Sequence, residues 1–485
     1  MQCASYAKKI PSNGFIRNIA MGIVADDCGF RFQVKSFLPD LFNHRQSYFS
    51  HVCFLFNLYI HSLTSLTTKN FISCLDLADF DHLRDSKQFA YDLGDDLQGL
   101  VGASYSFTGS DGFKRTVIIE NVLYRAEGII IGRCSVVVGV RCVCTLPGCH
   151  WHVRNKIMKI SFPSRTRTSE EVFIRKARAK AETSGDHWAF NHLSNIIDSI
   201  TITYDPEKSV QGRLKAHLKE KYEERVMRVT ILEKLHPLSE LRNLREFAQV
   251  FYDILQIHQW LYECVGILHR DLSIGNIMFR RIDGKVYGVL NDFDLSSFVR
   301  DMDKGSSSNE RTGTRPFMSP DLLTPLWKRG HLYRHDLESL FFIVLCLACR
   351  YEEPGVLAAE PRAFTDRFSG TDDQVRKDLP IQPYFVDFTH WLAVIRNWLF
   401  SGYKERPGLQ SVADDLGEFS KDAPAFDPHY DWGTLNGYVS YAKFRKIMSS
   451  FQNIPLETRC CVTEDFGKMR KYYDRRQIKR MDSAA

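Results

Sequence analysis

Residues 269–297 read HRDLSIGNIMFRRIDGKVYGVLNDFDLSS and contain the motifs from which the fold can be predicted. This stretch places a carboxylate at Asp271, an amide at Asn276 and a second carboxylate at Asp292, in that order around a strand-like VYGVL. Mg²⁺ prefers hard oxygen ligands and takes only one or two carboxylates from a protein, which suits Asn276 and Asp292. Phosphoryl transfer needs such ligands together with a carboxylate beside the acceptor hydroxyl. The stretch therefore predicts phosphoryl-transfer chemistry with Asp271 as the general base.

Short motifs such as HRD or DFD also occur in ordinary surface turns, so the segments that follow them are needed. Residues 312–321 read TGTRPFMSPD, the later run YRHDLESLFFIVL contains Asp336, and Arg406 precedes a proline. The first of these resembles the segment that closes a protein-kinase activation loop, with Asp321 in place of the usual Glu. Asp336 matches the aspartate that opens the central buried kinase helix. Arg406 matches the late arginine that pairs with the acid of the closing segment. Thr314 falls where Ser/Thr kinases contact the catalytic aspartate from the activation segment, so a contact with Asp271 is expected, and it favours Ser or Thr over Tyr as the acceptor.

Four segments resemble those of the fungal-type protein kinases, a family expanded in mushroom-forming fungi. They read HRDLSIGNIMF, YGVLNDFDLSS, RTGTRPFMSPDLL and YRHDLESLFFIVL. The resemblance covers roughly residues 117–420 and includes HWAFNHL at His187. It implies an α+β, two-lobed kinase fold with a small β-rich lobe and a larger, mainly helical lobe. It also implies an enzyme that uses ATP and Mg²⁺ and transfers the γ-phosphoryl group to Ser or Thr hydroxyls of a protein substrate.

The same resemblance gives a domain plan for the chain. Residues 1–95 form an N-terminal region without an assigned function, 96–232 the smaller lobe with a charged insertion near 205–225, 233–420 the larger lobe, and 421–485 an extension with a basic tail. Within the activation segment, Ser306, Ser307, Ser308 and Thr312 are candidate phosphorylation sites, because a phosphate there has Arg270 as a possible partner.

The nucleotide-binding residues of the smaller lobe are assigned by the resemblance. Lys159, in KIMKISF, matches the strand lysine that holds the α- and β-phosphates, and Glu170 matches its helical partner, with Glu171 as the alternative. Phe173 and Ile174 lie three and four residues after Glu170, so apolar anchors share its helical face. Gly128 and Gly132 belong to the glycine-rich loop, whose other two glycine positions hold Cys134 and Val137.

Two alternatives to an active protein kinase stay open. A pseudokinase scaffold is favoured by the eroded glycine loop and by Ser273, which occupies the place of a lysine that steadies phosphate in Ser/Thr kinases. A small-molecule phosphotransferase of the aminoglycoside-kinase type shares the Asp, Asn and Asp set. The closing segment that ends at Asp321 argues against this second alternative, because those enzymes lack it.

Composition excludes several other classes. The net charge of +6 is small against 64 basic and 58 acidic residues, so nucleic acid is not expected as the main partner. The 13 cysteines are scattered and odd in number, which favours a reducing, intracellular compartment. The apolar runs at 52–60 and 340–349 are too short to span a bilayer and predict buried core segments. The basic tail from Lys468 is an alternative nuclear-import signal, and oligomeric state is left undetermined.

Local patterns predict the order of secondary structure. Val117–Val143 is rich in Val, Ile and Gly and predicts a β-hairpin, with further strands at Lys156–Ile160 and Val226–Leu232. A helix is expected from Ser169, which has acidic residues after it, and a longer helix around Leu244–His258.

One cluster of residues in this lobe has a second interpretation. Cys142, Cys144, Cys149, His150 and His152 are of the types that bind zinc, and CxC and HxH spacing points alternate residues to one face. An ordinary hairpin connection is the simpler alternative, and we prefer it from the sequence alone.

Overall fold

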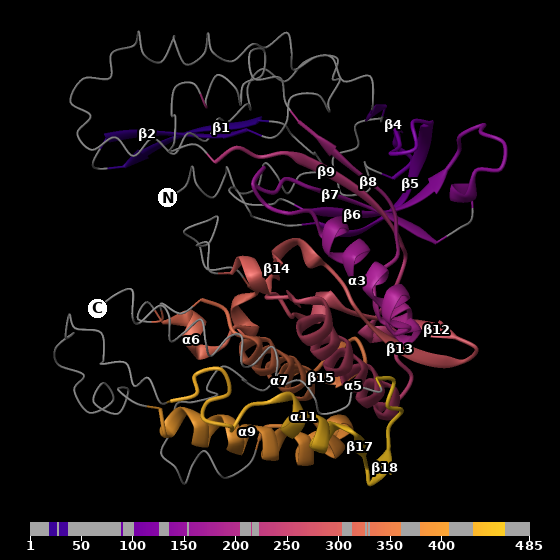
Figure 1. Cartoon of the computed structure of the whole chain (residues 1–485). Coiled ribbons are helices and arrows are strands. Elements are labelled where there is room, and N and C mark those ends of the chain that lie inside the picture. The colour runs from indigo at the N-terminus through magenta and orange to yellow at the C-terminus, as the bar shows by residue number, and fades with distance from the viewer. Residues whose placement is uncertain are drawn as a thin grey trace. The chain divides into compact units, whose positions relative to one another are not determined.

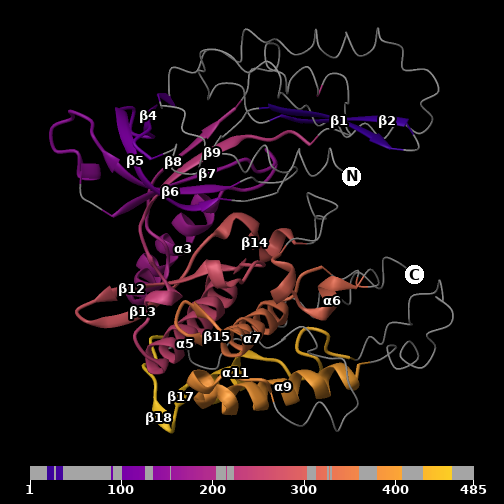
Figure 2. The same ribbon diagram turned by 180° about the vertical axis from the view of Figure 1, so that it is seen from behind.

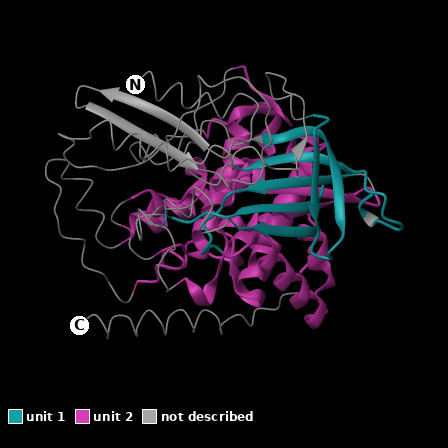
Figure 3. Ribbon diagram, turned by 90° about the horizontal axis from the view of Figure 1, so that it is seen from above, with its two compact units in different colours: residues 1–167, 195–234 teal, residues 168–194, 235–485 magenta. Residues whose placement is uncertain are grey.

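The computed structural model describes residues 101–125, 135–152, 155–203, 215, 223–302, 313–324, 327, 330–359, 379–406 and 430–460, and the backbone of residues 19–26, 29–36 and 89–90. The chain divides into two compact units, of which unit 1 contains residues 1–167 and 195–234 and unit 2 contains residues 168–194 and 235–485 (Figure 3). Strands dominate unit 1 and helices dominate unit 2, so the architecture is mixed α+β.

Unit 1 is built on a seven-stranded sheet of order β3-β4-β5-β6-β7-β9-β8, in which all neighbours are antiparallel (Figure 1). The predicted hairpin and the two further predicted strands are confirmed as β5 with β6, β7 and β9. The sequence analysis did not predict β4 or β8. The strands are β3 (Phe89–Ala90), β4 (Ser104–Thr108), β5 (Lys114–Arg125), β6 (Val136–Cys142), β7 (Lys156–Ser161), β8 (Ile196–Ile202) and β9 (Met227–Glu233), and β1 (Ile19–Asp26) pairs with β2 (Gly29–Ser36) in a separate hairpin.

Alternation of side chains across the pleat gives this sheet its core. On β6 the residues Val136, Val138, Val140 and Cys142 are buried, at the spacing of two that directs side chains to one face. They pack in one apolar cluster with side chains of the neighbouring strands and with Trp151. Apolar burial of this extent stabilises the sheet at about 25 cal/mol per Å² of surface removed from water.

Unit 2 contains the helices and several short strand pairs (Figures 1 and 2). Its helices are α3 (Glu170–Ser184), α5 (Leu244–Trp260), α6 (Pro320–Leu323), α7 (Tyr333–Arg350), α9 (Thr389–Lys404) and α11 (Tyr441–Met448). The strands are β10 (His236–Pro237), β12 (Ile277–Ile282) and β13 (Lys285–Leu290) in one sheet, and the pairs β11 (Ile267–Leu268) with β14 (Ser297–Phe298), β15 (Tyr351–Glu353) with β16 (Val356–Leu357), and β17 (Ser450–Phe451) with β18 (Ile454–Pro455).

The two predicted helices are present as α3 and α5. Ser169 is the N-cap of α3, although its side chain makes no capping hydrogen bond, and Gly185 ends the helix in the left-handed conformation. Asn243 caps α5 by accepting a hydrogen bond from the Glu246 backbone N–H at 3.0 Å. Helix α7 is buried along almost its whole length, as expected for the run 340–349. Among the described residues no helix is both long and apolar enough to cross a bilayer, and the run 52–60 lies outside them.

The β12–β13 hairpin explains how the two central motifs meet. Asp283 and Gly284 form its turn, both with positive φ (49° and 78°), which is the geometry that suits a right-twisted hairpin. The register pairs Ile277 with Leu290 at the open end. The ladder therefore continues into Asn276, whose carbonyl accepts a hydrogen bond from the Asn291 N–H at 2.9 Å. Residues that end one motif and begin the next are thus held side by side.

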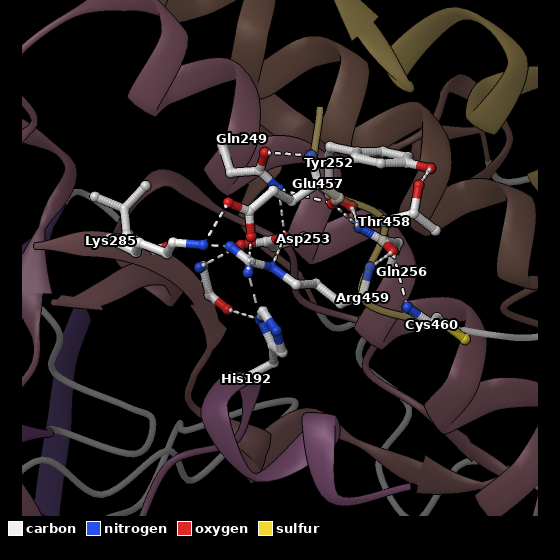
Figure 4. A network of polar contacts seen from close by, with 12 residues as sticks. His192, Gln249, Tyr252, Asp253, Gln256, Lys285, Glu457, Thr458, Arg459 and Cys460 are labelled. Atoms are coloured by element: carbon white, nitrogen blue, oxygen red, sulfur yellow. Dashed lines mark hydrogen bonds and ion pairs between the residues drawn. The ribbon is translucent and has the colours of Figure 1, made fainter. Parts of the chain in front are cut away.

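Residues 456–460 form a C-terminal strap that binds along α5 through two buried glutamines (Figure 4). Gln249 accepts from the Glu457 N–H at 2.8 Å and donates to its carbonyl at 3.0 Å. Gln256 accepts from the Arg459 N–H at 2.7 Å. The Arg459 guanidinium then lies over the Tyr287 ring at 4.3 Å and reaches Asp253 at 3.3 Å. The strap therefore ties the end of the described chain to the centre of unit 2.

Candidate active site

His269 connects the motif that precedes β12 to Asn291, the residue that follows β13. Its Nε2 lies 3.0 Å from the Asn291 carbonyl oxygen, so this nitrogen carries the proton and donates. Its Nδ1 is then free to accept from the Asp271 N–H at 3.4 Å. Burial lowers the pKa of His269, which keeps the ring neutral and preserves this division of roles. The ring also packs edge-on against Phe293 with centroids 5.0 Å apart.

Arg270 adopts a strained backbone that is stabilised from α7. Its φ is 71°, in the region that non-glycine residues rarely occupy. Its N–H donates to Asp336 Oδ2 at 2.9 Å, and its Nη1 donates to Ser297 Oγ at 2.6 Å. Strain of this kind costs about 1–3 kcal/mol and persists only where surrounding contacts fix it. Asp336, identified from the sequence as the opening residue of the buried helix, therefore sets the backbone path into Asp271.

Two histidines that the sequence analysis did not identify complete the Asp336 site. His258 Nε2 donates to its Oδ2 at 2.9 Å, and His331 Nε2 donates to its Oδ1 at 2.7 Å. Burial acts to raise the pKa of Asp336, but these histidines hold that pKa well below its ordinary value. The carboxylate thus stays ionised while almost fully enclosed. No local signal in the sequence marks His258, because it lies 78 residues before Asp336 on another helix.

Asp271 is 6% exposed and is held by contacts on both sides. Thr314 Oγ1 donates to its Oδ1 at 2.9 Å, which confirms the contact expected between the closing segment and this aspartate. Asn276 Nδ2 donates to the Asp271 backbone carbonyl at 2.7 Å. Since the Asn276 amide nitrogen is used in this way, its oxygen is oriented away from that bond and is the atom available to a cation.

Asp292 stands at the start of a cluster of carboxylates. Its φ is 60°, and its Oδ1 accepts from the Asp294 N–H at 3.2 Å. One carboxylate oxygen from each of Glu170, Asp292 and Asp294 lies within 4.8 Å of the others. Glu170 comes from the first turn of α3, whereas the other two follow β13. Three oxygen donors at this separation match the ligand preference of Mg²⁺, and Asp294 was not among the residues predicted from the sequence.

The closing segment is fixed by a buried ion-pair network around Asp321, which is 1% exposed. Arg406 Nη1 donates to its Oδ1, which confirms the predicted pair, and Arg334 Nη2 donates to its Oδ2. Arg334 also donates to Glu338 Oε1 at 2.5 Å and to the Trp432 carbonyl at 2.7 Å. Burial lowers the pKa of Arg406 to about 10, so it remains charged at neutral pH. The sequence analysis did not identify Arg334, whose partner Asp321 lies 13 residues earlier in a separate segment.

The remaining predicted residues lie in unit 1, at the start of α3 or outside the described residues. Lys159 is 7% exposed in the middle of β7, between Val137 of β6 and Thr230 of β9. Gly128, Gly132 and Cys134 lie outside the described residues, as do Ser306, Ser307, Ser308, Thr312, most of the charged insertion and the basic tail. Glu171, the alternative to Glu170, pairs instead with Arg175 on the helix surface at 2.7 Å.

Comparison with known proteins agrees with this arrangement of motifs. The family model described as fungal protein kinase matches residues 100–349, more than half of the 485 residues. A probable cell cycle serine/threonine-protein kinase, a CDC5 homolog of Encephalitozoon cuniculi, is 31% identical over 88 residues, which is 18% of this chain and only 17% of that protein. A solved structure of vaccinia related kinase 3 aligns over 76% of this chain and 88% of its own, with a TM-score of 0.35 and 12% identity. The chain belongs to the fungal protein kinase family.

Proposed function

We propose that this protein is an ATP-dependent kinase that phosphorylates Ser or Thr hydroxyls of a protein substrate, with the two-lobed fold that the family resemblance implies. The observation that carries the proposal is the hydrogen bond from Thr314 Oγ1 to Asp271 Oδ1 at 2.9 Å. It connects the end of the activation segment to the residue proposed as base. The cell cycle relative is itself named a serine/threonine-protein kinase, which supports the choice of acceptor.

In the proposed mechanism Asp271 orients the acceptor hydroxyl and takes its proton. The strained Arg270 backbone, held by Asp336, fixes the direction in which the Asp271 carboxylate points. Thr314 holds the Oδ1 oxygen of this carboxylate through a hydrogen bond of 2.9 Å. A positioned base of this kind contributes about 10²–10⁴-fold in rate. Thr314 stands where Ser/Thr kinases have the residue that contacts this aspartate, which supports a Ser or Thr acceptor over Tyr.

The residues around Asp292 fit a magnesium ion, because their donors are all oxygens and converge within 4.8 Å. Asn276 and Asp292 would hold it, with Asp294 and Glu170 close enough to bind or to orient its waters. When bound, Mg²⁺ neutralises the charge that develops on the phosphates. The family resemblance assigns Lys159 to hold the α- and β-phosphates, Glu170 as its partner, and Gly128 and Gly132 to the glycine-rich loop, and we include these assignments in the proposal. The domain plan, with the two lobes at 96–232 and 233–420, and an intracellular location are parts of the same proposal.

The test is phosphoryl transfer by purified protein with Mg-ATP, followed by phosphoamino-acid analysis. Wild type is expected to yield phosphoserine or phosphothreonine, while Asp271→Asn keeps ATP binding and loses about 10²–10⁴-fold of the rate. Asp283→Asn is the matched control, since it makes the same change at the exposed hairpin turn. Equal, robust activity in Asp271→Asn and wild type would show that another carboxylate is the base.

A pseudokinase scaffold is a second candidate, and Ser273 is the observation that favours it. Ser273 stands two residues after Asp271, is buried and caps the short helix 274–276 with its backbone rather than offering a cation. Loss of a phosphate-steadying cation weakens transition-state stabilisation. ATP binding by wild type without transfer above the no-enzyme background, to itself or to a broad peptide library, would favour this candidate. Recovery of transfer in Ser273→Lys would identify the missing cation as the cause.

A further inference from the structure

Three cysteines and one histidine of unit 1 converge in the connection between β6 and β7. Cys142 ends β6, Cys144 follows it, Cys149 comes after a turn, and His152 ends the short helix 150–152. One potential ligand atom of each lies within 4.8 Å of all the others. Two turns of backbone produce the convergence, because the Cys149 N–H bonds to the Leu146 carbonyl and the His152 N–H bonds to the Cys149 carbonyl. We propose that these four residues bind a structural zinc ion.

The distances within the cluster match tetrahedral coordination. Cys142 Sγ and Cys144 Sγ lie 3.4 Å apart, and Cys144 Sγ lies 3.5 Å from His152 Nε2. A tetrahedral zinc with ligands at about 2.3 Å for sulfur and about 2.0 Å for nitrogen places two sulfurs roughly 3.8 Å apart and sulfur and nitrogen roughly 3.5 Å apart. A disulfide needs about 2.05 Å between sulfurs, and all three cysteines are free. Four filled positions from protein are typical of structural rather than catalytic zinc.

Two buried cations, Arg115 and Lys156, lie beside the sulfurs, while burial raises the pKa of the Cys142 thiol to about 12, so the proposal rests on the geometry of the four ligand atoms. Burial raises the pKa of the Cys149 thiol, but hydrogen bonds from the Trp151 backbone and the Arg115 side chain bring it below its ordinary value overall. Arg115 is 4% exposed and lies over the Trp151 ring at 4.6 Å, so its position is fixed. Lys156, also buried, interacts electrostatically with Cys142 and Cys149. Three thiolates and one neutral imidazole around Zn²⁺ carry one net negative charge, which Lys156 offsets, because Arg115 is already paired with Asp111 at 2.5 Å.

Zinc can reach the cluster from solvent, and its binding must break one existing hydrogen bond. His152 is exposed and Cys144 and Cys149 are half-buried, so the cluster opens to solvent on one side. His152 Nε2 lies 2.8 Å from the Cys144 carbonyl oxygen, and this hydrogen bond is exchanged for the metal. Zinc binding releases the thiol protons, because only thiolate and neutral imidazole coordinate. Soft sulfur with imidazole in tetrahedral geometry selects zinc over Mg²⁺ or Ca²⁺.

A zinc ion here would fix the β6–β7 connection. Strand β7 carries Lys159, and its register with β6 pairs Lys159 with Val137. Metal ligands at both ends of the connection restrict how far the two strands can slip relative to each other. The zinc therefore stabilises the sheet of unit 1 whether or not the protein transfers phosphate, and a zinc measurement is independent of the proposed kinase activity.

The experiment measures metal content of the full chain purified with reductant and zinc but without chelator. Wild type is expected to hold about one zinc per chain, in line with one closed four-ligand site. The double variant Cys144→Ser, Cys149→Ser is expected to lose that zinc, while Cys264→Ser, a half-buried free cysteine of unit 2, retains it. Equal zinc content in the double variant and wild type would overturn the assignment.

A second measurement uses wild type alone, in case the double variant does not fold. Zinc is expected to protect Cys142, Cys144 and Cys149 from iodoacetamide, and a chelator is expected to expose them, as peptide mapping by mass spectrometry would show. Replacement by Co²⁺ is expected to give the intense visible bands of a tetrahedral thiolate site. Unchanged alkylation of these three cysteines with and without zinc, or a disulfide among them in the zinc-treated protein, would refute the proposal.

Discussion

Two groups of acidic residues in unit 2 differ in the charges that surround them. Around Asp321 the charges alternate, because Asp321 and Glu338 are interleaved with Arg334 and Arg406. Around Asp292 three carboxylates converge within 4.8 Å of one another. Like charges at that separation repel, and a cation bound between them relieves the repulsion. The first arrangement therefore holds the chain together, whereas the second is suited to binding a cation.

Hydrogen bonding reinforces the difference. Tyr403 donates to Glu338 at 2.7 Å and lies 3.0 Å from Ser319 Oγ, so hydroxyls extend the Asp321 network into α9 and α6. Asp292 instead takes a positive φ and uses one oxygen on a neighbouring backbone N–H. Backbone strain of this kind is concentrated at functional sites, because it must be held by the rest of the fold. The comparison predicts opposite responses to mutation in the two groups.

The largest effect is expected for Arg334→Met. Removal of this fully buried guanidinium leaves two carboxylates without their shared cation, and breaking a buried pair in this way costs about 3–5 kcal/mol. The unfolding midpoint measured by differential scanning calorimetry should fall by several degrees. Arg350→Met is the control, because it changes the same residue type at the exposed end of the same helix. The unfolding midpoint of Arg406→Ala should lie between those of Arg334→Met and Arg350→Met. Equal midpoints for Arg334→Met and Arg350→Met would remove the structural role from the network.

A smaller and different effect is expected for Asp292→Asn. This variant removes one of three like charges, so its midpoint without nucleotide should stay close to that of wild type. Its stabilisation by Mg-ATP should disappear, where wild type at a ligand concentration of 100 times Kd gains about 2.7 kcal/mol. Thermal-shift titration with ATP, with and without Mg²⁺, provides the measurement, and Asp283→Asn should behave as wild type. Undiminished magnesium-dependent stabilisation in Asp292→Asn would contradict the site.

Another acidic residue, the fully buried Asp253, is intermediate between the two groups. It has one arginine partner, Arg459, and one histidine neighbour, His192. Burial raises the pKa of Asp253 from 3.8 to about 7, and burial lowers the pKa of His192 from 6.5 to about 3. Between about pH 4 and 6.5 the folded state holds the Asp253 proton that the unfolded state has lost, so this term makes stability fall as pH rises. His192 binds its proton only when unfolded in that range, so its term makes stability rise with pH.

His192→Asn should therefore reveal the Asp253 term alone. The asparagine side-chain amide can donate to the Gly288 carbonyl oxygen in place of His192 Nδ1, which lies 2.7 Å from that oxygen. The stability difference between variant and wild type should grow as pH rises from 4.5 to 6.5, by at most about 1.4 kcal/mol per pH unit. Urea unfolding at several pH values measures it. A difference that is constant across this range would mean that the two groups do not titrate as a compensating pair.

The smallest effect is expected for Thr314→Val, which removes one neutral hydroxyl from Asp271. Loss of a single hydrogen bond of this type costs about 1 kcal/mol, so the transfer rate should fall by roughly fivefold to tenfold with little change in the unfolding midpoint. Thr314→Ser keeps the hydroxyl and should keep the rate. A rate in Thr314→Val equal to that of wild type would show that this contact does not position the base.

Four strands of the unit 1 sheet, helices α3 and α5, and the residue pairs that belong to matched motifs could all be predicted from the sequence. Richness in Val, Ile and Gly predicted the hairpin of β5 and β6, helical spacing predicted α5, and the motif order connected Asp321 with Arg406 across 85 residues. These features are readable because periodicity depends on near neighbours and because family motifs carry their partners with them. The pair of Asp271 and Thr314 followed from the same resemblance.

Side chains that share a site but no common motif could be identified only from the packing of the folded chain. Asp294 with Glu170, His258 and His331 with Asp336, and the two glutamines of α5 with the C-terminal strap all come together through packing of separate elements. The same holds for Cys142, Cys144, Cys149 and His152, where strand spacing alone favoured a plain hairpin. Two turns after β6 bring their ligand atoms together, and backbone turns of that kind depend on hydrogen bonds that residue spacing does not record.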